Sequence, residues 1–381
     1  MVGRYGLSVT TRGGTEVPAP IGRMRSAWIA LAVGIVSVFS GTQPVAAEDL
    51  GSPYPDELQS VSVLTTSDVW AVGFTGYGQT AVLQHWDGQS WTEQASPRPG
   101  KLYGVIALAA NNVWAVGGYP ESHTVRSLIL HWDGASWSQI PSPNPSTFFN
   151  QFEAVSATSA NNVWAVGYSI NPTTHAHYGL TVHWDGARWS ANANPGVQLD
   201  GVATTTATNA WAVGAPANVL HWNGTSWAKQ YSIGGATLFD IAAPSSTYGW
   251  AVGELPLQGG KTQTLIVRWN GHSWTRIPSP NVNVNYNTLF GVSATSATNA
   301  WAVGCYGNGS SCAANNTLVL HWNGSTWTRV ATPHPGATGN RLADVSALSP
   351  TAAWTVGATQ TSDGATSMVR MRWDGAQWAL T

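Results

Sequence analysis

Tryptophan recurs along this chain in one pattern that is used seven times, and no other feature limits the possible folds so strongly. Of the 22 tryptophans, only Trp28 lies outside the pattern. Each copy opens with a Trp-Ala-Val-Gly cluster (Trp-Thr-Val-Gly in the last copy), followed by His/Arg-Trp-Asp/Asn-Gly-x-x-Trp, as in residues 85–91. The first clusters begin at Trp70, Trp114, Trp164, Trp211, Trp250, Trp301 and Trp354. A repeat of about 47 residues is typical of a solenoid, an array or a propeller.

Each copy has the pattern of four short β-strands. In the sixth copy these are residues 291–295, 300–304, 318–322 and 327–330, which are rich in β-branched and aromatic residues and bounded by Gly, Asn and Ser. No sustained helical period follows residue 47. A solenoid would need capping units, and none is visible. The sequence therefore predicts an all-β, seven-bladed β-propeller of four-stranded antiparallel blades over residues 61–381.

The third and fourth strands of every copy are joined by Asp-Gly or Asn-Gly, which predicts a two-residue type I′ turn. In that register Trp86 opposes Gln89, and His85 opposes Ser90. Because side chains alternate along a strand, Trp86 and Trp91 are expected on one face, where they pack against the neighbouring blade.

Residues 1–47 resemble a secretory signal peptide. Arg23 and Arg25 precede an apolar run at 27–39, and Pro-Val-Ala-Ala at 44–47 resembles a cleavage site. The run is shorter than the roughly 20 residues that cross a bilayer. Met24 stands where such a signal normally begins, so it is a possible true start. We expect a secreted, extracellular protein without membrane insertion after cleavage, in which residues 48–60 form an N-terminal segment.

The charge balance and the cysteines narrow the possible partners. The chain has 16 Lys and Arg against 18 Asp and Glu, and only 9% of its residues are charged. Such a surface offers no basic footprint for nucleic acid. Cys305 and Cys312 lie in one insert, which favours a disulfide in an exported protein. A metal site there would need further thiol or histidine ligands.

A family resemblance rests on the Trp-Ala-Val-Gly strand and the x-Leu-His-x-Asp-Gly-x-x-Trp hairpin. Together they resemble the BNR (Asp-box) propellers of secreted bacterial type, and among these the photosystem II assembly-factor branch, over residues 61–381. The resemblance implies a propeller whose Asp-box hairpins are structural and remote from any ligand site. The turn here is one residue shorter than the usual Asp-x-Gly-x-x-Trp, and the basic residues linked to assembly-factor work have no evident counterpart. No photosynthetic role is implied.

Several residues that look catalytic are explained by the repeat. The hairpin histidines lie one to a blade, so they cannot share an ion, and we expect them to pair with Ser or Thr across the hairpin. They are His85, His131, His183, His221 and His321, with Arg268 and Arg372 in the remaining copies. The hairpin Asp alternates with Asn, which suits a turn but not an acid or base. His175 and His177 lack an identifiable third ligand. We expect no metal, no cofactor and no catalytic residue in these motifs.

The variable segments are the better candidates for a binding site. Loops between the second and third strands differ in length, and the connections between blades carry aromatics; function commonly lies on such loops. The candidate ligand-binding residues are Tyr103, Phe148, Phe149, Glu153, Asp200, Asp240, Tyr286, Phe290 and Asp344. Two alternatives stay open: the aromatics fill the core between blades, or the aspartates merely line a wet channel.

These patterns favour a monomeric, non-enzymatic binding module for carbohydrate or an extracellular protein partner. The first alternative is a polysaccharide hydrolase or lyase that uses carboxylates at the channel mouth. The second is a structural or adhesion protein.

Overall fold

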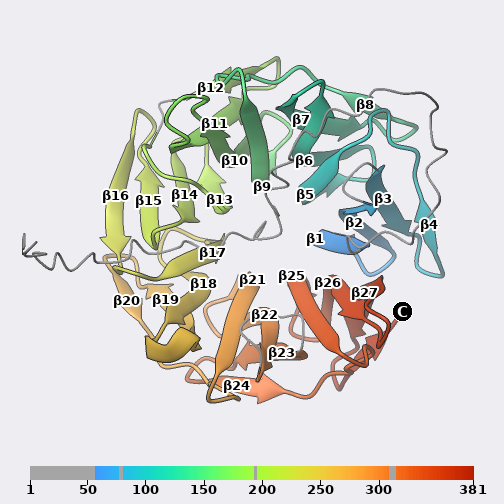
Figure 1. The fold of residues 1–381 in the computed structure, drawn as a ribbon, viewed down its shortest axis with the longest axis vertical. Helices are drawn as coiled ribbons and strands as arrows, with labels where there is room; N and C mark the ends of the chain where they lie inside the picture. The colour runs from blue at the N-terminus through green and yellow to red at the C-terminus, as the bar shows by residue number, and fades with distance from the viewer. Residues whose placement is uncertain (1–55, 77–79, 193–194, 309–314) are drawn as a thin grey trace, which may run out of the picture.

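The computed structural model describes residues 56–76, 80–192, 195–308 and 315–381. These residues hold seven four-stranded antiparallel units, the blades, arranged around a common centre (Figure 1). The all-β fold predicted from the tryptophan repeat is confirmed.

The first strand of each blade lies nearest the centre, and the fourth lies at the rim (Figure 1). The innermost strands are β1 (Glu57–Thr65), β5 (Lys101–Ala109), β9 (Phe149–Ser159), β13 (Gly201–Thr206), β17 (Thr237–Ala242), β21 (Tyr286–Ser296) and β25 (Gly339–Ser349). The second strands are β2 (Asp68–Thr75), β6 (Asn112–Glu121), β10 (Asn162–Ile170), β14 (Asn209–Gly214), β18 (Gly249–Pro256), β22 (Asn299–Gly307) and β26 (Ala352–Gln360). The third strands are β3 (Thr80–Trp86), β7 (Thr124–Trp132), β11 (His177–Trp184), β15 (Asn218–Trp222), β19 (Thr262–Trp269), β23 (Asn315–Trp322) and β27 (Thr366–Trp373). The outer strands are β4 (Trp91–Glu93), β8 (Trp137–Gln139), β12 (Trp189–Ala191), β16 (Trp227–Ser232), β20 (Trp274–Arg276), β24 (Trp327–Val330) and β28 (Trp378–Leu380).

Consecutive strands pair within each blade, so the repeat unit and the blade coincide. A single parallel pairing, Val125 on β7 with Phe149 on β9, additionally connects blades 2 and 3 into one sheet. One 3₁₀ turn, η2 (Gln258–Gly260), lies between β18 and β19. β1 begins at Glu57, so residues 57–60 are part of the first blade.

The tryptophans form the contacts between blades. The Trp of each second strand packs against both hairpin tryptophans of the next blade, as Trp70 does with Trp132 and Trp137 at ring-centroid distances of 5.3 and 5.4 Å. The last blade repeats this contact with the first: Trp354 lies 5.3 Å from Trp86 and 5.4 Å from Trp91. In the part of the chain that the structure describes, the ring is therefore closed by contacts between complete four-stranded blades, and no strand is exchanged between its ends.

The predicted register of the hairpin between third and fourth strands is wrong. Trp86 pairs directly with Trp91, and His85 with Thr92, so the loop has four residues, Asp87 to Ser90. The Asp87 carboxylate causes this, because its Oδ1 accepts hydrogen bonds of 2.8 Å from the backbone N–H groups of both Gln89 and Ser90. A side chain that bonds the backbone two and three residues onward replaces the tight two-residue turn. The two tryptophans still share one face, as expected.

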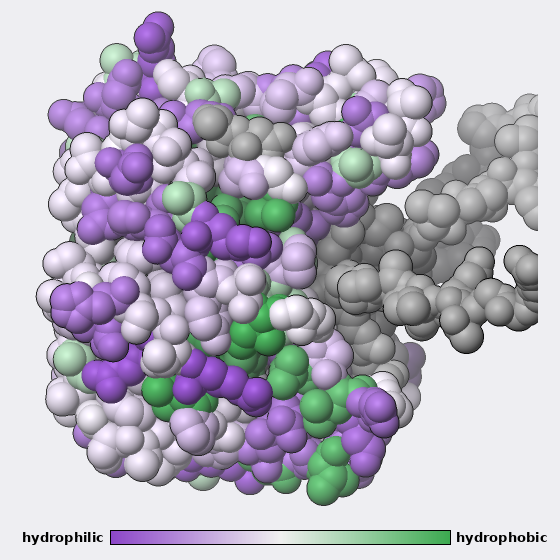
Figure 2. Space-filling view, turned by 90° about the vertical axis from the view of Figure 1, so that its left-hand side faces the viewer, coloured by the Kyte–Doolittle hydropathy of each residue, from purple (hydrophilic) through white to green (hydrophobic). Residues whose placement is uncertain are grey.

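The ends of the innermost strands define two faces of the propeller. The connections between blades and the loops between second and third strands lie at the end where the innermost strands begin; we call this the variable-loop face. The rim over β16 and β20 is mainly hydrophilic with small apolar areas between (Figure 2). Among the described residues, no helix is both long and apolar enough to span a bilayer.

Some expectations fall on residues outside this description. The predicted signal peptide and residues 48–55 lie outside the described residues, as does Cys312. The disulfide therefore stays a prediction; its other member, Cys305, is fully buried in β22.

Candidate functional site

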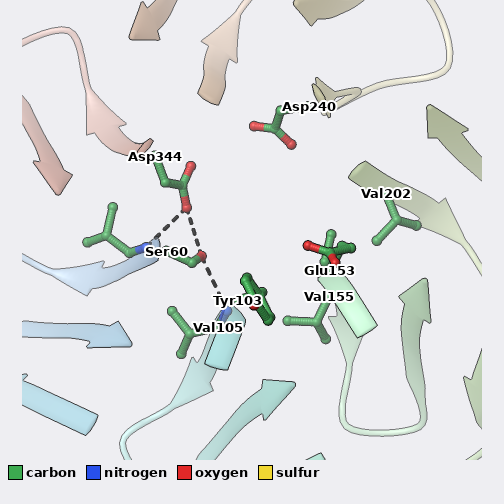
Figure 3. Close-up of a pocket in the computed structure, with 11 residues that line it drawn as sticks. Ser60, Tyr103, Val105, Glu153, Val155, Val202, Asp240 and Asp344 are labelled. Carbon is green, nitrogen blue, oxygen red and sulfur yellow. Dashed lines mark hydrogen bonds between the residues drawn. The ribbon is translucent and has the colours of Figure 1, made fainter. Parts of the chain in front are cut away.

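A pocket of about 130 Å³ lies at the centre of the ring, between the innermost strands of several blades. Four of the predicted site residues line it: Tyr103, Glu153, Asp240 and Asp344. They come from β5, β9, β17 and β25, and Figure 3 shows their side chains around one opening. The structure thus brings together residues that the sequence could only place near a channel.

Irregular pairing of the innermost strands explains this convergence. Their pairing with the second strands skips one residue near the start in six of the blades described. The skipped residues are Gln59, Tyr103, Glu153, Phe239, Phe290 and Ala343. Such β-bulges turn side chains out of the regular alternation, commonly beside functional sites. Asp240 and Asp344 each follow a bulge immediately.

Asp344 connects the last blade to the first. Its Oδ2 accepts hydrogen bonds from the Ser60 hydroxyl at 2.7 Å and from the Val61 N–H at 3.0 Å, both on β1 (Figure 3). Its Oδ1 accepts the N–H of Val345 at 2.7 Å. This carboxylate therefore supplies acceptors for an innermost strand whose inner edge has no neighbouring strand to pair with.

The same connection recurs around the channel. Asp240 Oδ2 accepts the N–H of Val292 in the next blade at 2.8 Å, and Ser60 Oγ accepts the N–H of Val105 at 3.3 Å. In β13 the residue that corresponds to Ser60, Asp240 and Asp344 is Gly201. Here the blades approach more closely, because a Cβ on Gly201 would lie 2.8 Å from the Cα of Asp240. A second set of serines, two residues onward, accepts N–H groups in the same way: Ser62, Ser156, Ser293 and Ser346. We call these contacts the inter-blade clamps.

Glu153 and Asp200 are almost completely buried, each with 1% of its surface exposed. Each accepts a hydrogen bond from the amide of a glutamine two residues earlier, Gln151 at 2.5 Å and Gln198 at 2.9 Å. Asp200 does not line the pocket. Burial raises the pKa of the Tyr103 phenol well above its ordinary value, and the nearby Glu153 carboxylate adds to this effect. Tyr103 is therefore a neutral hydrogen-bonding group at all ordinary pH values.

Charged side chains that sequence reasoning missed lie at the start of the innermost strands. Arg341 on β25 forms an ion pair with Glu57 on β1 across the junction of last and first blades, and its guanidinium lies 4.6 Å from the ring centroid of Phe290. Lys101 lies over the ring of Phe74 at 4.9 Å, and burial lowers its pKa. The arginines look scattered along the sequence, and only the closed ring brings Arg341 next to Glu57.

The predicted aromatic residues divide into two groups. Tyr286 and Phe290 are 5% and 7% exposed and pack with Phe239 and Cys305, so they lie in the core between blades. Phe152, on the same strand as Phe149, is fully buried. Phe148 is 39% exposed on the variable-loop face, and the ring of Phe149 stacks on Tyr168 at 5.3 Å.

The hairpin histidines have a structural role. Four of the five lie opposite a Ser or Thr on the fourth strand, as expected, and each histidine ring also contacts an Asn or Asp side chain at the start of the second strand. The Nε2 of His131 lies 3.0 Å from the side-chain oxygen of Asn112 on the second strand, and its ring lies 4.3 Å from that of Trp114. His85, His183, His221 and His321 contact Asp68, Asn162, Asn209 and Asn299 in the same way. Across residues 56–76, 80–192, 195–308 and 315–381, no three or more His, Cys, Asp or Glu side chains are arranged to hold a metal ion.

The closed ring of four-stranded blades defines a β-propeller protein. Among solved structures, it is similar to YCF48 bound to D1 peptide, with a TM-score of 0.54 and 16% identity over 84% of this chain and 93% of that chain. It is also similar to the WD40 β-propeller domain of Doa1, with a TM-score of 0.54 and 12% identity over 82% and 92% of the two chains. For YCF48 from Cyanidioschyzon merolae the TM-score is 0.52 and the identity 14%, over 83% and 95%.

Identities this low show a common fold and nothing finer. No protein-family model matches the chain. No curated protein matches it either. The relation to the Asp-box group therefore stays a prediction.

Proposed function

We propose that this protein is a secreted, non-enzymatic binding module that holds a glycan or a protein partner on its variable-loop face. One observation carries the proposal: two of the carboxylates that line the central pocket hold neighbouring blades together and the third is buried, whereas the variable-loop face presents an exposed aromatic residue on a rigid turn. General acid–base catalysis requires a carboxyl group within hydrogen-bond reach of the substrate. Asp240 and Asp344 instead bond backbone groups of the next blade, and Glu153 is 1% exposed.

The fold suits this role. Propellers place variable loops on a rigid frame, and binding residues concentrate on such loops. One structurally similar propeller is described as bound to a peptide, which supports a protein segment as one kind of ligand for this architecture.

The proposal is tested with the full chain on an array of polysaccharides and peptides, together with an assay for released products. We expect retention of at least one ligand without product release. Exchanging residues 171–176 for a minimal Gly-Asn connection should abolish retention. Exchanging the two-residue turn Ala110-Asn111 on the opposite face for Ser-Asn is the control and should leave it unchanged.

Three outcomes would contradict the proposal. The first is turnover of a polysaccharide that is lost in Glu153→Gln or Asp240→Asn. The second is binding that survives loop exchanges on the variable-loop face. The third is failure to retain any member of the array.

A further inference from the structure

The turn before β9 is held rigidly by its own side chains. Asn150, which is fully buried, accepts the N–H of Ser146 at 2.9 Å and donates to the Ser146 carbonyl at 2.7 Å. The Ser146 hydroxyl donates to the Ile170 carbonyl at 2.6 Å and accepts the N–H of Phe148 at 3.0 Å. The Phe148 carbonyl accepts the N–H of Val125 in blade 2 at 3.0 Å. The exposed ring of Phe148 therefore starts from a fixed backbone.

The frame of this turn does not require an aromatic residue. Asn287 and Asn340 hold the equivalent turns before the sixth and seventh blades by the same pair of bonds. At the position of Phe148, two residues before the asparagine, those turns carry Asn285 and Thr338. Of these three turns, only the one before β9 carries an exposed aromatic ring, that of Phe148. The other two turns form the same hydrogen bonds without an aromatic residue. The Phe148 ring is therefore free to offer its apolar face to a ligand without disturbing the turn.

His175 completes a corner with Phe148. The two rings are nearly perpendicular, with an interplanar angle of 77° and centroids 6.3 Å apart. His175 has a φ of 54°, a strained backbone conformation for a residue other than glycine. The loop enforces it: Asn171 Oδ1 accepts the N–H groups of Thr173 and Thr174 at 2.9 Å, and the Asn171 carbonyl accepts the N–H of His175 at 3.0 Å.

The residues that support Phe148 and His175 are also held in fixed positions. Phe149, the next residue, stacks on Tyr168, and Tyr168 stacks on His177 at 5.0 Å with an interplanar angle of 7°. His177 Nδ1 lies 2.8 Å from the side-chain oxygen of Gln198. A site that is ordered before its ligand arrives loses less entropy on binding.

The chemistry of the corner selects the ligand. Phe148 offers an apolar ring face, and the imidazole of His175 offers a hydrogen-bonding wall at right angles to it. The charged residues of the adjoining β6–β7 hairpin are paired with each other, since Arg126 Nε lies 3.1 Å from the Glu121 carboxylate. A ligand that fits both side chains is an uncharged ring with an apolar face for Phe148 and hydroxyl groups at its edge for His175. A pyranose sugar has these properties.

We propose that Phe148 and His175 form a subsite for one neutral pyranose ring of a glycan. The proposal rests on the proposed function and specifies its ligand class. Stacking on Phe148 would bind the C–H face of the sugar, and His175 would bond a hydroxyl at its rim. A proline-rich peptide is the competing occupant, because it also docks on exposed aromatic rings.

The test uses the full chain, titrated calorimetrically with neutral oligosaccharides and with a proline-rich peptide. Phe148→Ala should weaken oligosaccharide binding by about tenfold, the upper range for one aromatic contact. Phe148→Tyr should retain it. His175→Gly, which removes the ring and relieves the φ strain, should weaken binding while raising the melting temperature. Leu348→Ala is the matched control, since Leu348 is 41% exposed at the opposite end of an innermost strand.

The outcomes separate the two proposals. Oligosaccharide binding that resists Phe148→Ala but is lost on exchange of residues 171–176 overturns this subsite and leaves the binding module standing. Binding of the peptide but no oligosaccharide, lost in Phe148→Ala, overturns the sugar assignment. Absence of any ligand overturns both.

Discussion

Asp344 provides the sharpest test of how the ring is held closed. Replacing it with alanine removes the acceptor of the Val61 N–H and of the Ser60 hydroxyl, at 3.0 and 2.7 Å. A buried donor left without a partner costs about 1–3 kcal/mol. Because the pocket admits water to this carboxylate, we take the lower half of that range for each donor. The free energy of unfolding of Asp344→Ala should therefore fall by roughly 2–4 kcal/mol.

Two variants make the measurement specific. Asp344→Asn keeps one side-chain oxygen for β1 and should lose only about 1 kcal/mol. Asp363→Ala removes an exposed carboxylate in the same blade whose hydrogen bonds are local, to residues 361 and 365, and should change stability much less. Urea unfolding followed by tryptophan fluorescence gives the free energies. If Asp344→Ala lies within 0.5 kcal/mol of the unaltered protein, a threshold typical of surface substitutions, the carboxylate does not hold the seam and the reasoning is refuted.

Two further predictions concern the repeated motifs. Burial lowers the pKa of His131, His183, His221 and His321 below the ordinary value of 6.5, so the unfolded chain binds more protons than the folded protein just below pH 6.5. Stability should therefore fall as the pH drops from 7.5 to 5, as measured by the melting temperature, and a rise would contradict the burial argument. In the hairpin, Asp87→Asn should leave the melting temperature unchanged, because Asn223 makes the same two bonds at 2.9 and 3.0 Å. Asp87→Ala should lower it by roughly 1–3 °C, and equal melting temperatures for the two variants would show that the side-chain bonds are dispensable.

The blade architecture could be predicted from the sequence because the information is local and repeated. Each Trp-Ala-Val-Gly strand and each Trp hairpin specifies its own segment, and seven copies of one pattern fix the type of fold. The predicted hairpin register is wrong because the dipeptide Asp-Gly fits both a two-residue and a four-residue loop. The carboxylate of Asp87 selects the four-residue loop. That selection depends on hydrogen bonds from Gln89 and Ser90, which the dipeptide alone does not reveal.

The candidate site could be predicted only in part because its residues meet through the ring. Tyr103, Glu153, Asp240 and Asp344 do line one pocket, yet nothing in their spacing shows that two of them serve as inter-blade clamps. Asp344 and Ser60 are 284 positions apart in the sequence. The sequence does carry one signal. The position of Asp344 in the innermost strand holds a small residue or Asp in every copy, which indicates close contact between neighbouring blades; the residues are Ser60, Gly104, Ala154, Gly201, Asp240, Gly291 and Asp344.

The way the ring closes also bears on how such a chain can arise and be rearranged. Trp354 meets Trp86 and Trp91 through the same contact that every other pair of blades uses, so the junction between last and first blade shares the general packing of the ring, with the Arg341–Glu57 ion pair in addition. A gene encoding this chain can therefore begin at any blade. A circularly permuted version that opens between blades 3 and 4, with residues 381 and 56 joined by a connection like residues 94–100, should close the same ring. The order of the blades in space is set by their contacts, and the position of the termini is free to vary.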